Sequence, residues 1–256
     1  MEIGAVTGYI DVAQITLYAF WIFFAGLIYY LLQENKREGY PLESDRSANV
    51  RVQGWPPMPR AKTYLLRDGT TRTVPAAAQP AQPLAARPMG RWPGAPLVPT
   101  GNPMLDGVGP GSYANRPDVV DTTVEGAARI VPLRAAPDFD VASQDPDPRG
   151  TPVRGADGVV GGTVVDLWVD RAEMLFRYLE LEVTAVGGTR RVLLPINFTR
   201  IGRDGVRVQS ILGAQFAQVP ATRMPELVTL LEEEKIMAYY GGGVLYAEPS
   251  RQEPLL

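Results

Sequence analysis

An uncharged run near the N-terminus constrains this chain more than any other feature. The run extends from Val12 to Leu32, and Gln14 and Thr16 are its only strongly polar members. At a rise of roughly 1.5 Å per residue it would form about 31 Å of helix, which matches the hydrocarbon core of a bilayer. The run therefore predicts one transmembrane helix, with a buried core helix as the alternative.

The residues that flank the run predict its fate and its orientation. A cleaved signal peptide begins with basic residues, whereas residues 1–11 contain Glu2 and Asp11 but no Lys or Arg. We therefore expect the helix to remain in the mature protein. Lys36 and Arg37 follow it directly, so the positive-inside rule places the N-terminus outside and the rest of the chain in the cytoplasm.

The segment after the helix is basic, whereas the distal part is acidic. Residues 33–103 hold ten Lys and Arg against five Asp and Glu, and residues 104–256 hold fifteen against twenty-one. The positive excess lies beside the predicted span, where anionic lipid headgroups would attract it. Lys36, Arg37 and Tyr40 are the candidate lipid contacts at the membrane surface.

Proline governs the next stretch of the chain. Eleven prolines lie between Trp55 and Pro103, which precludes a regular helix or a central strand. Such a segment is either a disordered linker or an extended chain laid over a partner's surface. Within it, Thr63–Val74 reads as a short hairpin that turns at Asp68-Gly69.

The distal region has the alternating pattern of a β protein. Apolar and polar residues alternate in Gly162–Asp170, which predicts a half-buried strand, and the pattern returns in Tyr178–Val183. Turns at residues 187–188 and 204–205 join further short strands. We expect four or five strands that form a small barrel or a curled sheet.

A helix is predicted near the C-terminus, from Pro225 to Gly243, with Gly241 past its end. The three glutamates 232–234 are most simply a solvated face of this helix. The glycine clusters 155–162 and 241–243 lack the spacing of nucleotide-binding loops, so we interpret them as turns or caps.

The composition excludes many chemistries. The chain has no cysteine, which excludes a disulfide scaffold, a thiolate metal site and a cysteine nucleophile. It has no histidine either, so it lacks the commonest metal ligand and the base of a Ser-His-Asp triad. The acidic distal half also speaks against binding of nucleic acid. An enzyme built on this chain would have to use Asp and Glu chemistry.

Five segments carry a family resemblance. They are FWIFFAGLIYYLLQENKREGYPLE, GNPMLDGVGPGSY, TPVRGADG, VVDLWVD and LLEEEKIMAYYGGGVLYAEP. In this order they resemble the H subunit of the purple-bacterial (type II) photosynthetic reaction centre. The resemblance covers nearly the whole chain and is weakest around residues 44–55 and 76–93.

The resemblance implies an α+β fold in which one N-terminal transmembrane helix precedes a mostly-β cytoplasmic domain. That domain contains a small PRC-type β-barrel and a C-terminal helix. The implied divisions are a periplasmic tail at residues 1–11, the transmembrane helix at 12–32, an extended Pro-rich membrane-surface segment at 33–104 and the cytoplasmic domain at 105–256.

The resemblance also implies a function and a set of partners. The chain would be a non-enzymatic, non-pigment-binding subunit of the bacterial inner (intracytoplasmic) membrane that caps the L and M subunits. Those partners would hold the bacteriochlorophyll, bacteriopheophytin, quinones and non-haem iron. Phospholipids, a cytochrome subunit and a light-harvesting complex are further candidate partners. The rival interpretations are a membrane-tethered β-barrel adaptor for another complex and an anchored enzyme.

Five residues are candidates for the proton-transfer path to the secondary quinone. The resemblance makes Asp170 and Glu173 members of the proton path and gives Arg177 the role of tuning their charge, whereas the residues alone suggest a solvated loop. Clustered carboxylates raise one another's pKa, which would help them to relay protons near neutral pH. Family members often have histidines where the path begins at the surface. Here Asp121 and Glu125 are the candidate proton collectors in their place.

Overall fold

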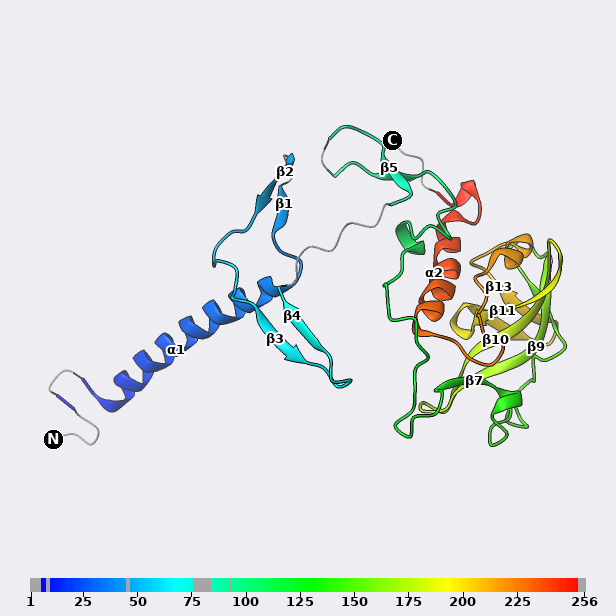
Figure 1. Ribbon diagram of the computed structural model, residues 1–256, viewed down its shortest axis with the longest axis horizontal. Coiled ribbons are helices and arrows are strands. Elements are labelled where there is room, and N and C mark those ends of the chain that lie inside the picture. Colours follow the sequence, from blue (N-terminus) through cyan, green and yellow to red (C-terminus); the bar gives the residue numbers. More distant parts are fainter. Residues whose placement is uncertain (1–5, 8–9, 45–46, 76–83, 93, 253–256) are drawn as a thin grey trace. The chain divides into compact units, whose positions relative to one another are not determined.

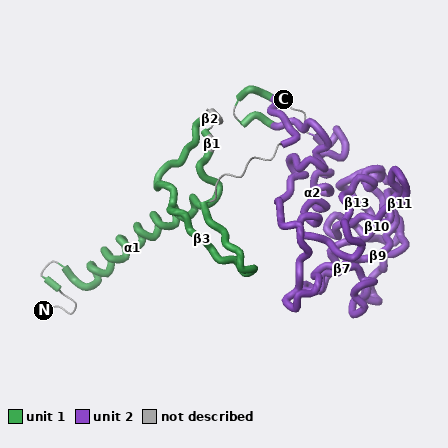
Figure 2. The backbone as a smooth tube through the Cα atoms, viewed as in Figure 1, with its two compact units in different colours: residues 1–82, 90–96 green, residues 83–89, 97–256 purple. Residues whose placement is uncertain are grey.

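A computed structural model describes residues 6–7, 10–44, 47–75, 84–92 and 94–252. The chain separates into two compact units, shown in different colours in Figure 2. The first unit consists of residues 1–82 and 90–96, and the second of residues 83–89 and 97–256.

The first unit is built on helix α1, Val12–Glu34. Asp11 caps the helix by accepting a hydrogen bond from the backbone N–H of Gln14 at 2.7 Å. None of the helix residues is buried within the chain, although nearly all of them are apolar. An apolar helix of this length without a protein environment indicates single-pass membrane anchoring. The short 3-10 helix η1, Asn35–Arg37, follows directly.

Two antiparallel hairpins complete the first unit. In the first, β1 (Leu42–Ser44) pairs with β2 (Ser47–Val52). In the second, β3 (Lys62–Leu65) pairs with β4 (Thr71–Val74), and this confirms the hairpin expected around Asp68-Gly69. Among the described residues between Trp55 and Pro103 there is no α-helix, as their prolines predict.

The second unit contains a small hairpin and a curled sheet of seven strands (Figure 1). The hairpin pairs β5 (Ala86–Pro88) with β6 (Leu97–Pro99). The sheet has the order β11-β10-β9-β8-β13-β12, and β7 also pairs with β9. Its strands are β7 (Ile130–Pro132), β8 (Pro152–Arg154), β9 (Val160–Asp170), β10 (Leu175–Ala185), β11 (Gly188–Pro195), β12 (Thr199–Gly202) and β13 (Gly205–Val208). Only β8 and β13 pair in parallel among these strands.

Short 3-10 helices connect the strands of this unit. They are η2 (Gly109–Gly111), η3 (Leu133–Ala135), η4 (Ile196–Phe198), η5 (Gly213–Gln218) and η6 (Pro249–Arg251). Helix α2, Leu230–Tyr246, packs against the sheet and η2 and supplies buried Ile236, Tyr239 and Tyr240 to the core. The unit therefore has the α+β fold expected from the sequence, with a C-terminal helix.

Strand β9 is not half-buried as predicted, because both of its faces are covered near its end. Leu167 and Val169 belong to the core, and Trp168 and Asp170 on the other face are buried as well. On that second face, the loop residues Thr222, Arg223 and Pro225 line the same cavity as Trp168. Alternation of apolar and polar residues cannot reveal such a covering loop, because the loop comes from more than 50 residues away in the sequence.

Helix α2 differs from its prediction at both ends. It begins at Leu230 because Thr229 is the N-cap and forms a capping box with Glu232. The helix continues through Gly241–Gly243, which do not end it. A Cβ atom on Gly243 would lie 2.5 Å from the carbonyl oxygen of Ser210, and one on Gly242 would lie 3.1 Å from the Cα of Gly111. These glycines therefore permit close packing of the helix on its neighbours.

Candidate functional site

Asp170 is the last residue of β9 and organises the turn into β10. Its Oδ1 accepts hydrogen bonds from the backbone N–H groups of Ala172 and Glu173, both at 3.0 Å. Its side chain is 0% exposed. The solvated loop that the residues alone suggested is therefore wrong for Asp170, whereas the side chains of Glu173 and Arg177 are 48% and 42% exposed.

Arg129 binds Asp170 from a distant part of the chain. Strand β7 pairs with β9 so that Ile130 lies opposite Asp170, and this register brings the preceding Arg129 to the carboxylate. The Nε of Arg129 donates to both Asp170 oxygens at 3.0 Å, and its Nη2 lies 2.9 Å from Oδ2. The same guanidinium contacts Glu173. The sequence does not identify Arg129 as a partner of Asp170, because no local pattern indicates a contact between residues that are 41 positions apart.

Asp121 and Arg177 complete the group, which we call the Asp170 cluster: Asp121, Arg129, Asp170, Glu173 and Arg177. The Nη1 of Arg129 lies 3.4 Å from Oδ2 of Asp121. Arg177 lies 4.0 Å from Asp170 and 3.9 Å from Glu173, measured between its nitrogens and their carboxylate oxygens. Four of the five proton-path residues expected from the sequence thus lie together.

Glu125 lies apart from this cluster. It is exposed on the turn closed by hydrogen bonds between Thr123, Gly126 and Ala127. A hydrogen bond from the side chain of Thr123 holds the pKa of Glu125 below the usual carboxyl range. The turn lies between Asp121 and Arg129 in the chain. These two residues are also joined directly, since the backbone N–H of Arg129 donates to the carbonyl of Asp121 at 2.9 Å.

The pKa of Asp170 is lowered, contrary to the expected mutual raising of clustered carboxylate pKa values. Burial by itself would raise the pKa, but the hydrogen bonds from Arg129 and from the N–H groups of Glu173 and Ala172 outweigh it. The pKa of Arg129 is raised in turn, chiefly by its hydrogen bond to Asp170. Asp170 is therefore a fixed anion, and Glu173, with a 48% exposed side chain, is the accessible carboxylate of the pair.

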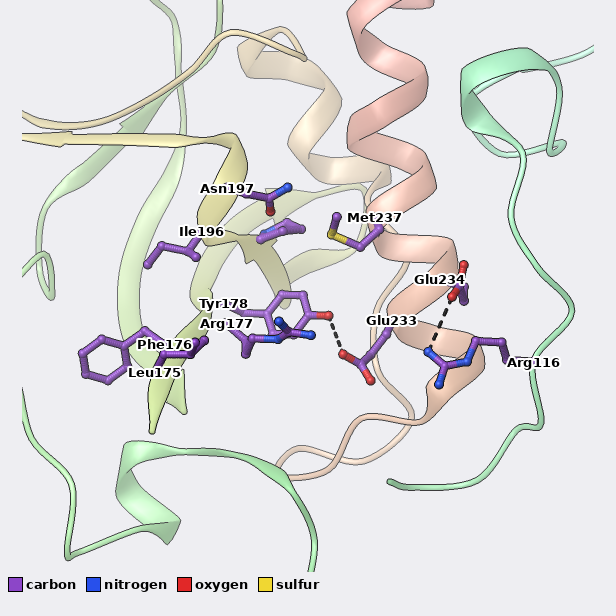
Figure 3. A pocket seen from close by; sticks show the side chains of 11 residues that line it. Arg116, Leu175, Phe176, Arg177, Tyr178, Ile196, Asn197, Glu233, Glu234 and Met237 are labelled. Atoms are coloured by element: carbon purple, nitrogen blue, oxygen red, sulfur yellow. Dashed lines mark hydrogen bonds and ion pairs between the residues drawn. The ribbon is translucent and has the colours of Figure 1, made fainter. Parts of the chain in front are cut away.

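A cavity of about 530 Å³ adjoins the Asp170 cluster between β10 and α2 (Figure 3). Arg177 lines it, as do Tyr178, Glu233 and Glu234. The hydroxyl of Tyr178 donates to Oε2 of Glu233 at 2.7 Å. The solvated face expected for glutamates 232–234 is wrong for Glu232 and Glu233, which are both buried, because Glu232 caps α2 and Glu233 faces β10.

A second group of charges surrounds two buried carboxylates further along the same two strands, Asp166 on β9 and Glu180 on β10. We call it the Glu180 cluster: Arg134, Asp166, Glu180 and Arg191. Arg134 contacts Asp166 at 2.9 Å and also Glu180, while Arg191 lies 2.9 Å from Glu180. The indole N–H of Trp168 donates to Glu180 at 3.0 Å. Burial opposes ionisation of Glu180, yet the hydrogen bonds from Arg134, Arg191 and Trp168 lower its pKa overall.

The candidate lipid contacts lie in the first unit, just after α1. Lys36 is only 5% exposed, and its ammonium donates to the carbonyl oxygens of Gln53 at 2.6 Å and Pro56 at 2.5 Å. The same ammonium lies 5.2 Å from the ring centroid of Tyr40. Arg37 donates to the carbonyl of Val74 at 3.1 Å. Lys36 thus binds the segment that follows β2, and Arg37 binds β4, to the end of the helix.

Neither charged cluster has the composition of a metal site. Among the residues that the structure describes, no group of three or more Asp, Glu, His or Cys side chains could hold a metal ion. In the Asp170 cluster, the guanidinium of Arg129 occupies the point where the carboxylates converge.

Comparison with protein families gives two matches that together cover most of the chain. The family model described as "Photosynthetic reaction centre, H-chain N-terminal region" matches residues 4–135, which is more than half of the chain. The model described as "PRC-barrel domain" matches residues 140–215, and this confirms the expected small barrel. The first match contains Asp121 and Arg129, and the second contains Asp170, Glu173 and Arg177.

Proposed function

The chain belongs to the photosynthetic reaction centre H-chain family, and from this premise we propose that it caps the L and M subunits and carries protons toward their secondary quinone. Family membership implies association with L and M. It also favours a subunit of an electron-transfer complex over an adaptor or an anchored enzyme. The pigments, quinones and non-haem iron are then held by the partner subunits.

The proposed arrangement in the membrane follows from the helix and the charges beside it. Residues 1–11 lie in the periplasm, residues 12–32 cross the bilayer, residues 33–104 follow the membrane surface, and residues 105–256 form the cytoplasmic cap. The basic residues directly after the helix support this orientation. Phospholipids would contact the surface around Tyr40 rather than the charged groups of Lys36 and Arg37, which the chain's own carbonyls and Glu34 bind.

The Asp170 cluster is the observation that carries the proton-transfer proposal. Reduction of a quinone to a quinol consumes two protons, which have to cross the protein that shields the site. Three carboxylates of the cluster share two guanidinium groups, which leaves one net negative charge when all are ionised. That excess attracts protons from the cytoplasmic side.

Each member of the cluster then has a distinct role. Asp170 stays ionised and anchors Arg129, which fixes the position of the Glu173 carboxylate. Glu173 exchanges protons because its carboxylate is accessible. Arg177 is held 3.9 Å from Glu173 and stabilises its ionised form between transfers. Asp121, joined to the cluster through Arg129, collects protons at the surface together with Glu125 on the adjoining turn.

Flash-induced proton uptake and second electron transfer in detergent-solubilised complexes test this proposal. In Glu173→Gln the second transfer should slow by an order of magnitude or more, because an amide cannot pass a proton on. Reduction of the first quinone should stay intact. Glu182→Gln is the matched control, since Glu182 is an exposed glutamate on β10. Native kinetics in both variants would contradict the proposed path.

A further inference from the structure

Glu233 is a buried carboxyl group that the proposed path does not use. It lies in the first turn of α2 and is 9% exposed. One of its oxygens accepts the hydrogen bond from Tyr178 on β10, as Figure 3 shows. Within residues 94–252, which the structure describes without a gap, no ion pair reaches Glu233. Carboxylates are almost never buried without a cationic partner, so this one calls for a physical explanation.

The two arginines that line the same cavity are engaged with other carboxylates. Arg116 pairs with Glu234 at 3.5 Å, and Arg177 lies 4.0 Å from Asp170 and 3.9 Å from Glu173. The two arginines lower the pKa of Glu233 only by electrostatic attraction, without a direct contact. The negative charge of Asp121 raises that pKa and so opposes them. Tyr178 is thus the one direct partner of the carboxyl group among these described residues.

These surroundings favour the protonated form of Glu233. Burial raises its pKa above the usual carboxyl range, and the Tyr178 hydrogen bond and the charges of Arg177 and Arg116 only partly oppose this. Burial also raises the pKa of Tyr178, so the phenol keeps its proton and remains a donor. The carboxyl group also lies at the cavity wall, where solvent can reach it and exchange its proton.

Arg177 links Glu233 to the Asp170 cluster. Its guanidinium lies on the cavity wall with Glu233 and within 4.0 Å of both Asp170 and Glu173. When negative charge appears at Glu173 or at the quinone, the electrostatic potential at Glu233 becomes more negative. At a buried group such as Glu233 this effect is stronger than it would be in water.

We propose that Glu233, with Tyr178 as its fixed donor, is a second proton-holding site that supplements the Asp170 cluster. The inference rests on the proposed function. When negative charge appears at the quinone, the ionised fraction of Glu233 binds a proton from the solvent in the cavity and forms the carboxyl O–H bond. When the charge is removed, that O–H bond breaks and the proton returns to the solvent. The carboxylate that remains is stabilised by the Tyr178 hydroxyl and the nearby Arg177 and Arg116.

Infrared difference spectroscopy on complete complexes tests the inference. Quinone reduction should change a protonated-carboxyl C=O stretch that shifts in heavy water and is lost in Glu233→Gln. Glu234→Gln is the matched control and should retain the band, because Glu234 is paired with Arg116. In Tyr178→Phe the band should persist to higher pH, since the hydrogen bond that favours the ionised form is removed. A band unchanged in Glu233→Gln would overturn the inference.

A second measurement uses the full chain in detergent and needs no quinone. Because the folded-state pKa of Glu233 is raised, the folded chain binds more protons than the unfolded chain above the ordinary pKa of 4.5. The free energy of unfolding should therefore fall as pH rises through that window, and Glu233→Gln should lack this contribution. Identical pH profiles would also overturn the inference.

The outcomes separate this inference from the proposed function. If Glu173→Gln slows the second transfer but Glu233→Gln leaves the infrared band and the pH profile as in the native chain, only the further inference fails. If Glu173→Gln has no effect while Glu233→Gln removes the band, Glu233 still holds a proton and the Asp170 path fails.

Discussion

The two charged clusters around β9 and β10 each contain a buried carboxylate, yet their hydrogen bonding differs. In the Glu180 cluster, two carboxylates meet two arginines, and both Glu180 oxygens accept hydrogen bonds. At the other end, three carboxylates share two arginines, and buried Glu233 adjoins them with a single phenol donor. Burial of a carboxylate is therefore not by itself a sign of proton transfer. A carboxylate whose charge is only partly neutralised, and which lies beside a cavity, is the better indicator of proton transfer.

This difference separates stability from proton transfer. The Glu180 carboxylate is fixed in one ionisation state because each of its oxygens is bound by a donor. The Glu173 side chain is 48% exposed although it contacts two arginines, so solvent can reach its carboxylate. We therefore expect substitutions in the Glu180 cluster to change the unfolding free energy, and substitutions at Glu173 to change kinetics.

The largest effect on stability is expected for Glu180→Ala. This change leaves the Trp168 indole N–H without its acceptor and removes one of the two buried carboxylates that bind Arg134, which should cost about 3 kcal/mol of unfolding free energy. Denaturant titration of the full chain in detergent measures it. Glu182→Ala, two residues along the same strand and exposed, should cost less than about 0.5 kcal/mol. Equal losses in the two variants would refute the structural role of the Glu180 cluster.

Arg129→Gln should remove about 2 kcal/mol and alter the acid dependence of stability. The folded-state pKa of Asp170 is lowered, so its contribution is present above the unfolded value of 3.8 and is lost as pH falls toward the folded value. Without Arg129 the folded pKa rises and this acid-induced loss becomes smaller. Unfolding measured between about pH 5 and pH 2 checks the sign. A steeper acid loss in the variant would contradict the role of Arg129.

Replacement of both proton collectors should have a moderate effect on kinetics. The Asp121→Asn and Glu125→Gln double variant should slow the second proton uptake several-fold, because two surface carboxylates beside the path are neutralised. Asp138→Asn, an exposed aspartate outside the cluster, serves as the control. An unchanged uptake rate in the double variant would show that protons reach Glu173 elsewhere.

The smallest effect is expected from added zinc or cadmium. Both ions bind imidazole well, and this chain has no histidine at the surface where the path begins. Low micromolar concentrations should therefore inhibit proton uptake only weakly. Strong inhibition that disappears in the Asp121→Asn and Glu125→Gln double variant would reveal a carboxylate metal site that the geometry does not indicate.

Local patterns predicted most of the secondary structure but little of the depth of burial. Charge-free length predicted α1, and alternation with turn residues predicted β9, β10 and the β12–β13 hairpin. Arg129 could not be found because its place beside Asp170 depends on the pairing of β7 with β9. Glu233 looked like part of a solvated face because the run of three glutamates contains no signal of the contact with Tyr178. The grouping of Asp170, Glu173 and Arg177 came from the family resemblance.

The most direct test compares second electron transfer in complexes that carry Glu173→Gln with complexes that carry Glu180→Gln. Glu173 lies in the turn between β9 and β10, and Glu180 lies on β10. Each change removes one negative charge and keeps the shape of the side chain. We predict a slowing of at least about tenfold in Glu173→Gln, with normal first-quinone reduction, and native kinetics in Glu180→Gln. Native kinetics in Glu173→Gln, or equal slowing in the two variants, would contradict the assignment of proton transfer to the Asp170 cluster.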